Sequence, residues 1–464
     1  MKPELLMPAG DLEKAKIAYQ FGADACYGST SAFSMRTREI GFDYKTLAEA
    51  INFAHSIGKK FYVTLNTYPH EFELSDIRKH AKKLIAMSPD AIILADAGIF
   101  QIVKITIDNY SSSLSRSPVK NSSRLRSNNK IEIHLSTQAN TTNSESIKFW
   151  AKQGVDRFIL AREVSLEEII EIRKNVPKKI KIETFVHGAM CMSISGRCHL
   201  SNYLTGRDAN RGACAQVCRW GFAVSEEKRA GQYMPVEQDE KYSYIFNAKD
   251  LNMIEHLDKL ATAGIDSFKV EGRNKSIYYC AIVARAYRKA IDLICHPDSP
   301  AGEEGSRVGK ILRSAQNDRI KILSKELSTV STRGYCTGFY FGKPNDEATN
   351  YKTSRAQSKW DFVGIVKSVI PSEAEGSISG SPIKSGMTSE CHYIAEGRGE
   401  IFPGNRIEIV TPDKIIKMKL NNLISAKGQL LEKINPNYKF IITCKEKIPN
   451  NSMIRIKTSN KKQP

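Results

Sequence analysis

The sequence lacks any apolar run of the length that a membrane-spanning helix needs. Its first residues, Met1 to Glu4, lead directly into the strand-like residues 5–7, without the apolar stretch of a signal peptide. Ten cysteines are present, but four of them fall between Cys191 and Cys218, which is unlike the spacing of a secreted disulfide framework. These absences argue against membrane-spanning and disulfide-rich secreted proteins, and we expect a reducing compartment, the cytoplasm.

The sequence has fewer acidic than basic residues: 50 Asp and Glu against 69 Lys and Arg, which gives a formal net charge of +19. Lys and Arg can replace the counterions condensed on phosphates, so this excess predicts a polyanionic partner, with RNA as the leading candidate. Part of the excess is local, in residues 111–130 and 414–462. A solvated basic surface is the alternative interpretation.

A β/α unit recurs in the first 275 residues. The hydrophobic content of the whole chain, 41% of 464 residues, supports a large core. An amphipathic helix ends at a glycine, an aspartate follows two residues later, and a short apolar strand comes next, as in Gly22-Ala23-Asp24. Eight apolar segments read as strands: residues 5–7, 25–27, 61–65, 91–95, 131–135, 158–160, 180–185 and 268–270. Eight such strands predict an N-terminal (β/α)8 barrel over residues 1–345.

Barrels of this kind place their chemistry at the C-terminal ends of the strands. In this sequence those ends carry mostly polar residues, although turns also favour Asn, Asp and Gly. The strand-end residues are Tyr27, Asn66, Asp96, Gln138, Arg162, Glu163, His187, Glu271 and Arg273. We expect a substrate site among them, with Tyr27, Asn66, Asp96 and Gln138 as possible substrate contacts or as core and turn residues.

The last hundred residues have a different pattern, with short alternating strands at residues 362–366, 406–410 and 440–443. They predict a small, basic C-terminal β-barrel domain over residues 360–464. Three stretches rich in Ser, Gly, Asn and charge interrupt the two domains, at residues 111–129, 297–318 and 372–388. We expect disordered inserts there, without a part in catalysis.

The cysteine cluster is the strongest local signal, because six, fifteen and three residues separate Cys191, Cys198, Cys214 and Cys218. Four thiolates this close suit one metal centre. Structural zinc usually takes two tight Cys-x-x-Cys pairs, and an iron–sulfur cluster tolerates these looser loops better. Zinc, or cysteines without a ligand, are the alternatives.

The cysteines lie within a longer motif that is found in a known family. Residues 183–191 read Glu-Thr-Phe-Val-His-Gly-Ala-Met-Cys, and residues 196–201 read Gly-Arg-Cys-His-Leu-Ser. This pattern resembles the signature of the collagenase-like peptidase family U-32. The similarity extends through residues 7–10, 22–24, 212–214, 268–273 and 402–412, so that it covers nearly the whole chain outside the inserts.

The resemblance implies a 4Fe-4S cluster on the four clustered cysteines and hydroxylation of RNA or of a quinone precursor without dioxygen. Within the family, the chain length and residues 210–216 resemble members that hydroxylate the wobble uridine of tRNA in a prephenate-dependent way. The expected partners are therefore tRNA and a small anionic metabolite. A partner subunit is a further possibility, and with it a non-catalytic role as an iron–sulfur scaffold that delivers another enzyme to RNA.

The family's older name implies a metal-dependent peptidase that degrades collagen, and this is the alternative function. A zinc peptidase needs a metal motif such as His-Glu-x-x-His, and a serine or cysteine peptidase needs a nucleophile beside a base. The sequence has no His-Glu-x-x-His motif. His187 and Cys191 lie four residues apart and form a conceivable pair, but the cluster would already use Cys191.

An anionic co-substrate requires cations, so we predict a substrate site made of Arg162, Lys269 and Arg273 together with Glu271. Each cation is equally suited to a salt bridge with Glu163 or Glu271. We further predict Glu183 and His187 as the catalytic acid–base pair, because burial and nearby charge can tune such groups. Alternatively, Glu183 caps a loop through its carboxylate, and His187 only forms a hydrogen bond to Glu183.

Overall fold

The computed structural model describes residues 2–31, 33, 41–115, 130–191, 193–211, 213–220, 223–225, 233–235, 248–295, 307–342, 358–370 and 391–458. The chain forms two compact units. The first comprises residues 1–325 and 332–356, and the second comprises residues 326–331 and 357–464. No helix within these described ranges is both long and apolar enough to cross a bilayer.

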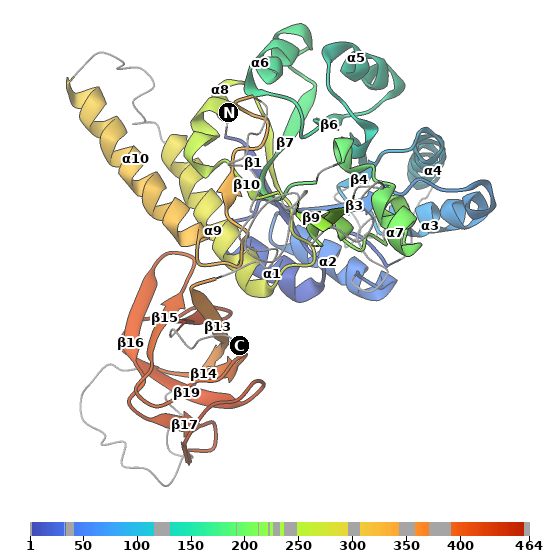
Figure 1. The fold of residues 1–464 in the computed structure, drawn as a ribbon. Coiled ribbons are helices and arrows are strands. Elements are labelled where there is room, and N and C mark those ends of the chain that lie inside the picture. Colours follow the sequence, from blue (N-terminus) through green and yellow to red (C-terminus); the bar gives the residue numbers. More distant parts are fainter. Residues whose placement is uncertain are drawn as a thin grey trace. The chain divides into compact units, whose positions relative to one another are not determined.

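A closed barrel of parallel strands forms the first unit (Figure 1). Neighbouring strands pair in chain order, and β11 pairs with both β7 and β1, which closes the sheet. The strands are β1 (Glu4–Pro8), β2 (Ala25–Gly28), β3 (Lys60–Leu65), β4 (Ala91–Leu94), β5 (Glu132–Leu135), β6 (Arg157–Ile159), β7 (Lys181–Ala189) and β11 (Ser267–Val270). Because every predicted apolar segment overlaps one of these strands, the prediction of a (β/α)8 barrel is confirmed.

Helices connect the strands and surround them (Figure 1). Side-chain caps fix where several of them begin: Asp11 accepts the N–H of Lys14 at 2.8 Å, and Ser165 forms a capping box with Glu168. The helices are α1 (Leu12–Gln20), α2 (Tyr44–Ser56), α3 (Leu74–Ala86), α4 (Ala97–Ser115), α5 (Ser144–Gln153), α6 (Leu166–Asn175), α8 (Leu257–Thr262) and α9 (Ile277–Ile294).

The repeated aspartates of the sequence have a common structural role. Each precedes one strand, and its carboxylate accepts the backbone N–H of the neighbouring strand. The pairs are Asp24 with Leu5 (2.9 Å), Asp90 with Phe61 (2.8 Å), Asp156 with Ile133 (3.0 Å) and Asp266 with Ile182 (2.8 Å). The glycine two residues before three of these aspartates has a positive φ, as at Gly154 (105°), which ends the preceding helix. The motif thus ties neighbouring strands together at the bottom of the barrel.

Strand β7 is longer than the sequence predicted, and an extended excursion of the chain follows it. Short strand β10 (Asp250–Asn252) pairs antiparallel with the end of β7, and β12 (Tyr335–Cys336) pairs with β10. Between β7 and β10 lie α7 (Leu200–Thr205), the 3-10 turns Ile194–Gly196, Ala209–Arg211 and Val217–Arg219, and the two-stranded pair of β8 (Ala223–Ser225) and β9 (Tyr233–Pro235). This excursion carries the four clustered cysteines.

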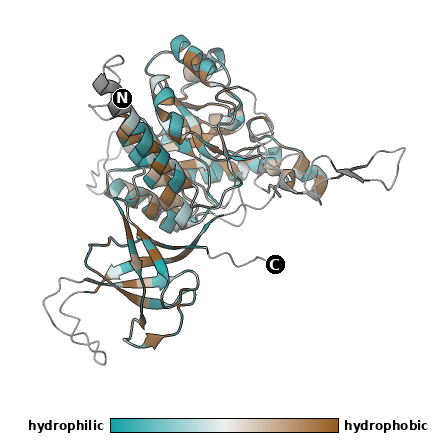
Figure 2. Ribbon diagram, turned by 60° about the vertical axis from the view of Figure 1, so that its left-hand side comes forward, coloured by the Kyte–Doolittle hydropathy of each residue, from teal (hydrophilic) through white to brown (hydrophobic). Residues whose placement is uncertain are grey.

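The second unit is an antiparallel sheet that curls into a half-barrel, as the sequence predicted (Figure 1). Hydrophobic and hydrophilic residues alternate along its strands (Figure 2), and the inward side chains, including Val366, Ile409 and Phe440, form its core. The strands are β13 (Trp360–Val369), β14 (Cys391–Gly397), β15 (Arg406–Val410), β16 (Ile415–Lys419), β17 (Leu423–Ser425), β18 (Leu430–Leu431), β19 (Lys439–Cys444) and β20 (Met453–Lys457).

Two of the predicted inserts are partly helical, which corrects the expectation of disorder. Helix α4 continues to Ser115, and helix α10 (Arg307–Leu327) covers the second half of the insert predicted at 297–318. In α10 apolar residues recur three or four positions apart, as at Ile320, Leu323 and Leu327, which are all buried, and this spacing supports a helix despite the low apolar content. Residues 116–129, 297–306 and the third insert at 372–388 lie outside the described residues.

Candidate functional site

A cavity of about 360 Å³ opens where the barrel strands end. Its walls come from the residues at or after β2, β3, β4, β5, β6, β7 and β11, and from the excursion that follows β7. The predicted site residues that line it are Tyr27, Asn66, Gln138, Arg162, Cys191, Cys198, Cys214, Cys218, Lys269, Glu271 and Arg273. The cavity therefore brings together most of the residues that the sequence selected.

The four clustered cysteines line this cavity, all as free thiols. Their loops are held by hydrogen bonds between excursion residues. Asn210 accepts the N–H of Cys198 and donates to the Cys198 carbonyl, both at 3.1 Å. Ser201 accepts the N–H of Ala215 at 2.9 Å. In the described part of the chain, no three His, Cys, Asp or Glu side chains are placed to share one metal ion.

Cations dominate the charge of the cavity. Lys269 and Arg273 line the cavity and are only 4% and 8% exposed, so both cations are shielded from bulk water. One guanidinium nitrogen of Arg273 donates to Ser29 at 2.8 Å and to Thr64 at 3.1 Å. Arg162 donates to the Ala189 carbonyl at 3.2 Å. A concave site with buried cations suits a small anionic ligand.

Aromatic rings support two of these cations. The Lys269 ammonium lies 4.4 Å from the ring centroid of Tyr27, and the Arg162 guanidinium lies 4.2 Å from that of Phe185. Both rings line the cavity. Such cation–π contacts hold the charged groups in place without neutralising them.

Glu183 lies below the cavity and does not line it in the described structure. Its side chain is fully buried and forms ion pairs with Lys269 (2.8 Å) and Arg157 (3.0 Å). Burial alone would raise its pKa, but Lys269 and Arg157 lower the pKa of the Glu183 carboxyl to about 2. The carboxylate therefore positions Lys269, while burial lowers the pKa of Lys269 against the opposing effect of Glu183.

The ion pairs continue through the barrel. Arg157 also pairs with Glu4 at 2.6 Å, and Glu4 accepts hydrogen bonds from Tyr62 (2.8 Å) and Ser267 (3.3 Å). This network fills the barrel interior with paired charges, which are acceptable in a core only when each has its partner. The sequence analysis did not identify Glu4 or Arg157, because no local pattern distinguishes them from surface charges.

His187 is also buried and is absent from the described lining of the cavity. Its Nδ1 lies 3.3 Å from the Tyr287 hydroxyl, and the rings of Tyr279, Tyr287 and Tyr335 surround it. Burial, with the charge of Lys275 as a second cause, lowers the pKa of the imidazole to about 3. His187 is thus neutral at physiological pH, and the acid–base role predicted for it and for Glu183 stays a prediction.

The remaining candidates divide between the cavity and the scaffold. Glu271 lines the cavity and is 8% exposed. Glu163 accepts the N–H of Ser195 at 2.7 Å, which fixes the turn after Cys191. Asp96 caps α4 by accepting the N–H of Ile99 at 2.9 Å. Lys275 lines the cavity, and the sequence analysis missed it because it lies in a loop beyond the strand end.

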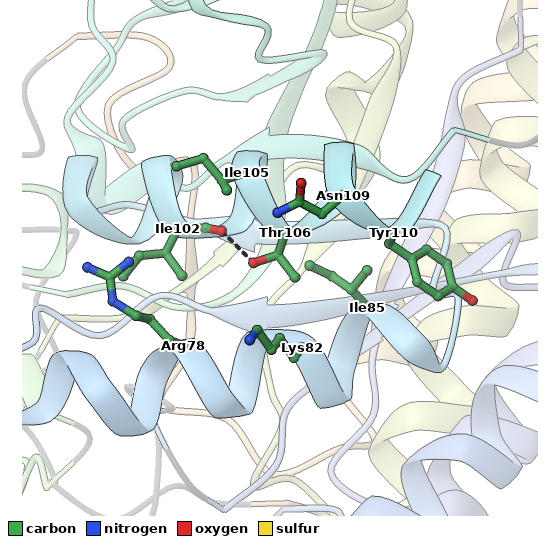
Figure 3. A pocket seen from close by; sticks show the side chains of 8 residues that line it. All are labelled: Arg78, Lys82, Ile85, Ile102, Ile105, Thr106, Asn109 and Tyr110. Carbon is green, nitrogen blue, oxygen red and sulfur yellow. Dashed lines mark hydrogen bonds between the residues drawn. The ribbon is translucent and has the colours of Figure 1, made fainter. Parts of the chain in front are cut away.

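A second cavity, of about 440 Å³, lies between helices α3 and α4 (Figure 3). Arg78 and Lys82 from α3 and Ile102, Ile105 and Tyr110 from α4 line it. None of the predicted site residues is among the described residues of its walls. The candidate site is therefore the cavity at the strand ends, which is lined by the four clustered cysteines and by the cations Lys269 and Arg273.

Comparisons with known proteins agree with the resemblance seen in the sequence. The profile of Peptidase family U32 matches residues 10–125 and 119–350, and that of the Peptidase family U32 C-terminal domain matches residues 384–455. The tRNA hydroxylation protein P of Escherichia coli is 34% identical over 470 residues, which cover 93% of this chain and 91% of that protein.

Two further relatives have different names. A protein of Porphyromonas gingivalis named collagenase is 28% identical over 463 residues, 97% of each chain. A 23S rRNA 5-hydroxycytidine synthase of Escherichia coli is 34% identical over 291 residues, which cover 63% of this chain and 39% of that protein. With both units matched by the family's profiles, the chain belongs to peptidase family U32.

Proposed function

We propose that this chain is a cytoplasmic tRNA-modifying enzyme that hydroxylates the wobble uridine. In this proposal Cys191, Cys198, Cys214 and Cys218 hold a 4Fe-4S cluster, and prephenate is a required co-substrate. One observation carries the proposal: the four free cysteines and the buried cations Lys269 and Arg273 line the same cavity. A redox centre and an anion site would then face one reaction space.

Two facts support an RNA substrate. The relatives named for hydroxylation of tRNA and of 23S rRNA share 34% of aligned residues with this chain. The net charge of +19 favours a polyanion, because binding releases the counterions of the phosphates. The lysine-rich second unit is the part of the chain that we propose to bind the tRNA body.

The donor set of the cavity fits an iron–sulfur cluster. Four thiols within one cavity are the ligands that such a cluster requires, and the loops that carry them are hydrogen-bonded through Asn210 and Ser201. When bound, the cluster would supply one-electron chemistry beside the substrate. Among the described residues no three such side chains are yet placed to share one metal ion, so the proposal requires the excursion to bring the sulfur atoms closer together when the cluster binds.

The cations of the cavity fit the carboxylates of prephenate. Lys269 is held by Glu183 on one side and by the Tyr27 ring on the other, so its ammonium group is already oriented when the ligand enters. Arg273 is anchored through Ser29 and Thr64. Groups that are fixed before binding lose little entropy on binding, so they orient a small anion efficiently.

The experiment that tests the function measures 5-hydroxyuridine in tRNA. Cells without the endogenous gene receive the native chain, Cys214→Ala, or the control Cys444→Ala, whose cysteine lies in the second unit. We expect nucleoside mass spectrometry to detect hydroxyuridine with the native chain and the control only, and only when prephenate synthesis is intact. Equal hydroxyuridine with all three chains would contradict the proposal.

A metal-dependent peptidase is the second candidate, because the collagenase relative matches 97% of this chain. The cavity offers thiols and hydroxyls as nucleophiles, but its described walls contain no histidine or aspartate beside them. Cleavage of a collagen-like peptide that requires zinc and is lost in Cys191→Ala would favour this function.

A further inference from the structure

The cavity contains a buried polar atom without a partner. The Oδ1 atom of Asn66 has no hydrogen-bond partner among the described residues, although Asn66 is only 9% exposed and lines the cavity. A buried acceptor left unsatisfied is costly, so such an atom usually indicates a ligand or an ordered water.

Neighbouring residues fix the orientation of this amide. The Nδ2 group of Asn66 donates to the Oε1 atom of Gln138, which also accepts the Ser136 hydroxyl at 3.3 Å. Ser136 in turn accepts the N–H of Gln138, because it caps the 3-10 turn Thr137–Ala139. Two donors therefore hold the Gln138 oxygen in place, and the Asn66 oxygen is left without a donor in a residue that lines the cavity.

The two amides together form a neutral, polar patch. Asn66 follows β3 and Gln138 follows β5, on either side of β4, whose Ile93 also lines the cavity. Asn66 carries an acceptor without a partner among the described residues, and the Nε2 group of Gln138 is a donor beside it. An acceptor beside a donor, with an apolar side chain between their strands, matches the edge of a flat heterocyclic base.

We propose that Asn66 and Gln138 form a subsite for the imide edge of the target uracil. The N3–H of uracil donates to Asn66 Oδ1, and an adjacent uracil carbonyl accepts from Gln138 Nε2. The anionic metabolite binds to the cations Lys269 and Arg273 in the same cavity. This inference rests on the proposed function, because it takes an RNA base as the ligand, and it adds the contacts that select that base.

The test compares binding of two RNAs to the full chain by fluorescence anisotropy. Both are labelled heptaadenylates, with one central uridine or one central 3-methyluridine, whose methyl group replaces the N3–H. We expect the native chain to bind the uridine RNA at least about fivefold more tightly, because methylation leaves the buried acceptor unpaired. Asn66→Ala should bind both RNAs equally. The control Asp96→Asn, at a strand end outside the cavity lining, should keep the native ratio.

Equal binding of the two RNAs by the native chain would overturn the subsite, even if Asn66→Ala does not fold. If a folded Asn66→Ala chain keeps the native ratio of the two affinities, the subsite is also overturned. The Asn66 oxygen would then accept a hydrogen bond from an ordered water and not from uracil. The outcome is separate from that of hydroxylation. A chain that prefers uridine but forms no hydroxyuridine contradicts the proposed function and not the subsite, and the converse result contradicts the subsite alone.

Discussion

Glu183 has no exposed surface and is nevertheless ionised, because Lys269 and Arg157 hold its pKa at about 2, against an ordinary value of 4.5. A carboxyl whose pKa is lowered by folding adds stability above its ordinary pKa and loses it as the pH falls towards the folded value. We therefore expect the free energy of unfolding to decrease by about 3 kcal/mol between pH 4.5 and pH 2 through this residue alone.

Glu183→Gln should remove this acid-dependent component and should lower stability at pH 7 by about 3–5 kcal/mol, because it leaves two buried cations with fewer partners. Urea unfolding at a series of pH values measures both effects. The control Glu145→Gln removes an exposed carboxylate paired with Lys148 and should change stability by less than about 0.5 kcal/mol. An unchanged pH profile in Glu183→Gln would contradict the paired, ionised state.

Lys269 gives a prediction about ligand binding. Its pKa is lowered by burial, so its positive charge is lost at a lower pH than that of an ordinary lysine. We expect the affinity of the full chain for prephenate to fall as the pH rises through this lowered pKa, and to fall at least about tenfold in Lys269→Met. Isothermal titration calorimetry tests this, with Lys148→Met on the surface as control. Equal affinities of the native chain and Lys269→Met for prephenate would show that the anion binds elsewhere.

At the scale of elements, the last residues of strand β7 depend on one glycine. Gly188 has a φ of +113°, and a Cβ atom there would lie 2.5 Å from the Glu271 carbonyl oxygen. Gly188→Ala should lower the free energy of unfolding by about 2–4 kcal/mol, from backbone strain and the steric clash together. Gly58 is a matched control, since its φ is +72° but no atom lies within 4 Å of its would-be Cβ.

Gly58→Ala should therefore cost only about 1 kcal/mol, the price of a left-handed backbone alone. Thermal unfolding of both variants measures the difference. Because the clash would displace Glu271 in the cavity wall, Gly188→Ala should also weaken prephenate binding, while Gly58→Ala should not. Equal destabilisation by the two substitutions would show that the close approach at Gly188 has little energetic weight.

The sequence predicted the barrel strands because each is an apolar run bounded by glycine and polar residues. It did not predict β10 and β12, since two or three residues such as Asp250 to Asn252 carry no alternating pattern. It also could not show which face of β7 a side chain occupies, because barrel strands are buried on both sides. For that reason it grouped Glu183 and His187 with the cavity, whereas the structure places them behind its walls.

At the scale of the whole molecule, the chain separates into a barrel unit that holds the cavity and a curled sheet rich in lysine. The strand-end rule predicted which residues meet in the cavity, because parallel strands of a barrel all end on one side. The cysteine spacing predicted one metal centre; the four cysteines line this cavity, and the metal centre stays a prediction. The orientation of Asn66 and the ion pairs through Arg157 and Glu4 depend on long-range packing, which the sequence pattern does not encode.

The most direct test of the account is an assay of iron and acid-labile sulfide, with an absorption spectrum, on chain purified without oxygen. We expect about four irons and four sulfides per native chain, as a 4Fe-4S cluster requires, and their loss in Cys191→Ala and Cys214→Ala but not in Cys444→Ala. Zinc alone in the native chain would contradict the cluster and would favour the metal-dependent peptidase, and the absence of any metal would contradict both functions.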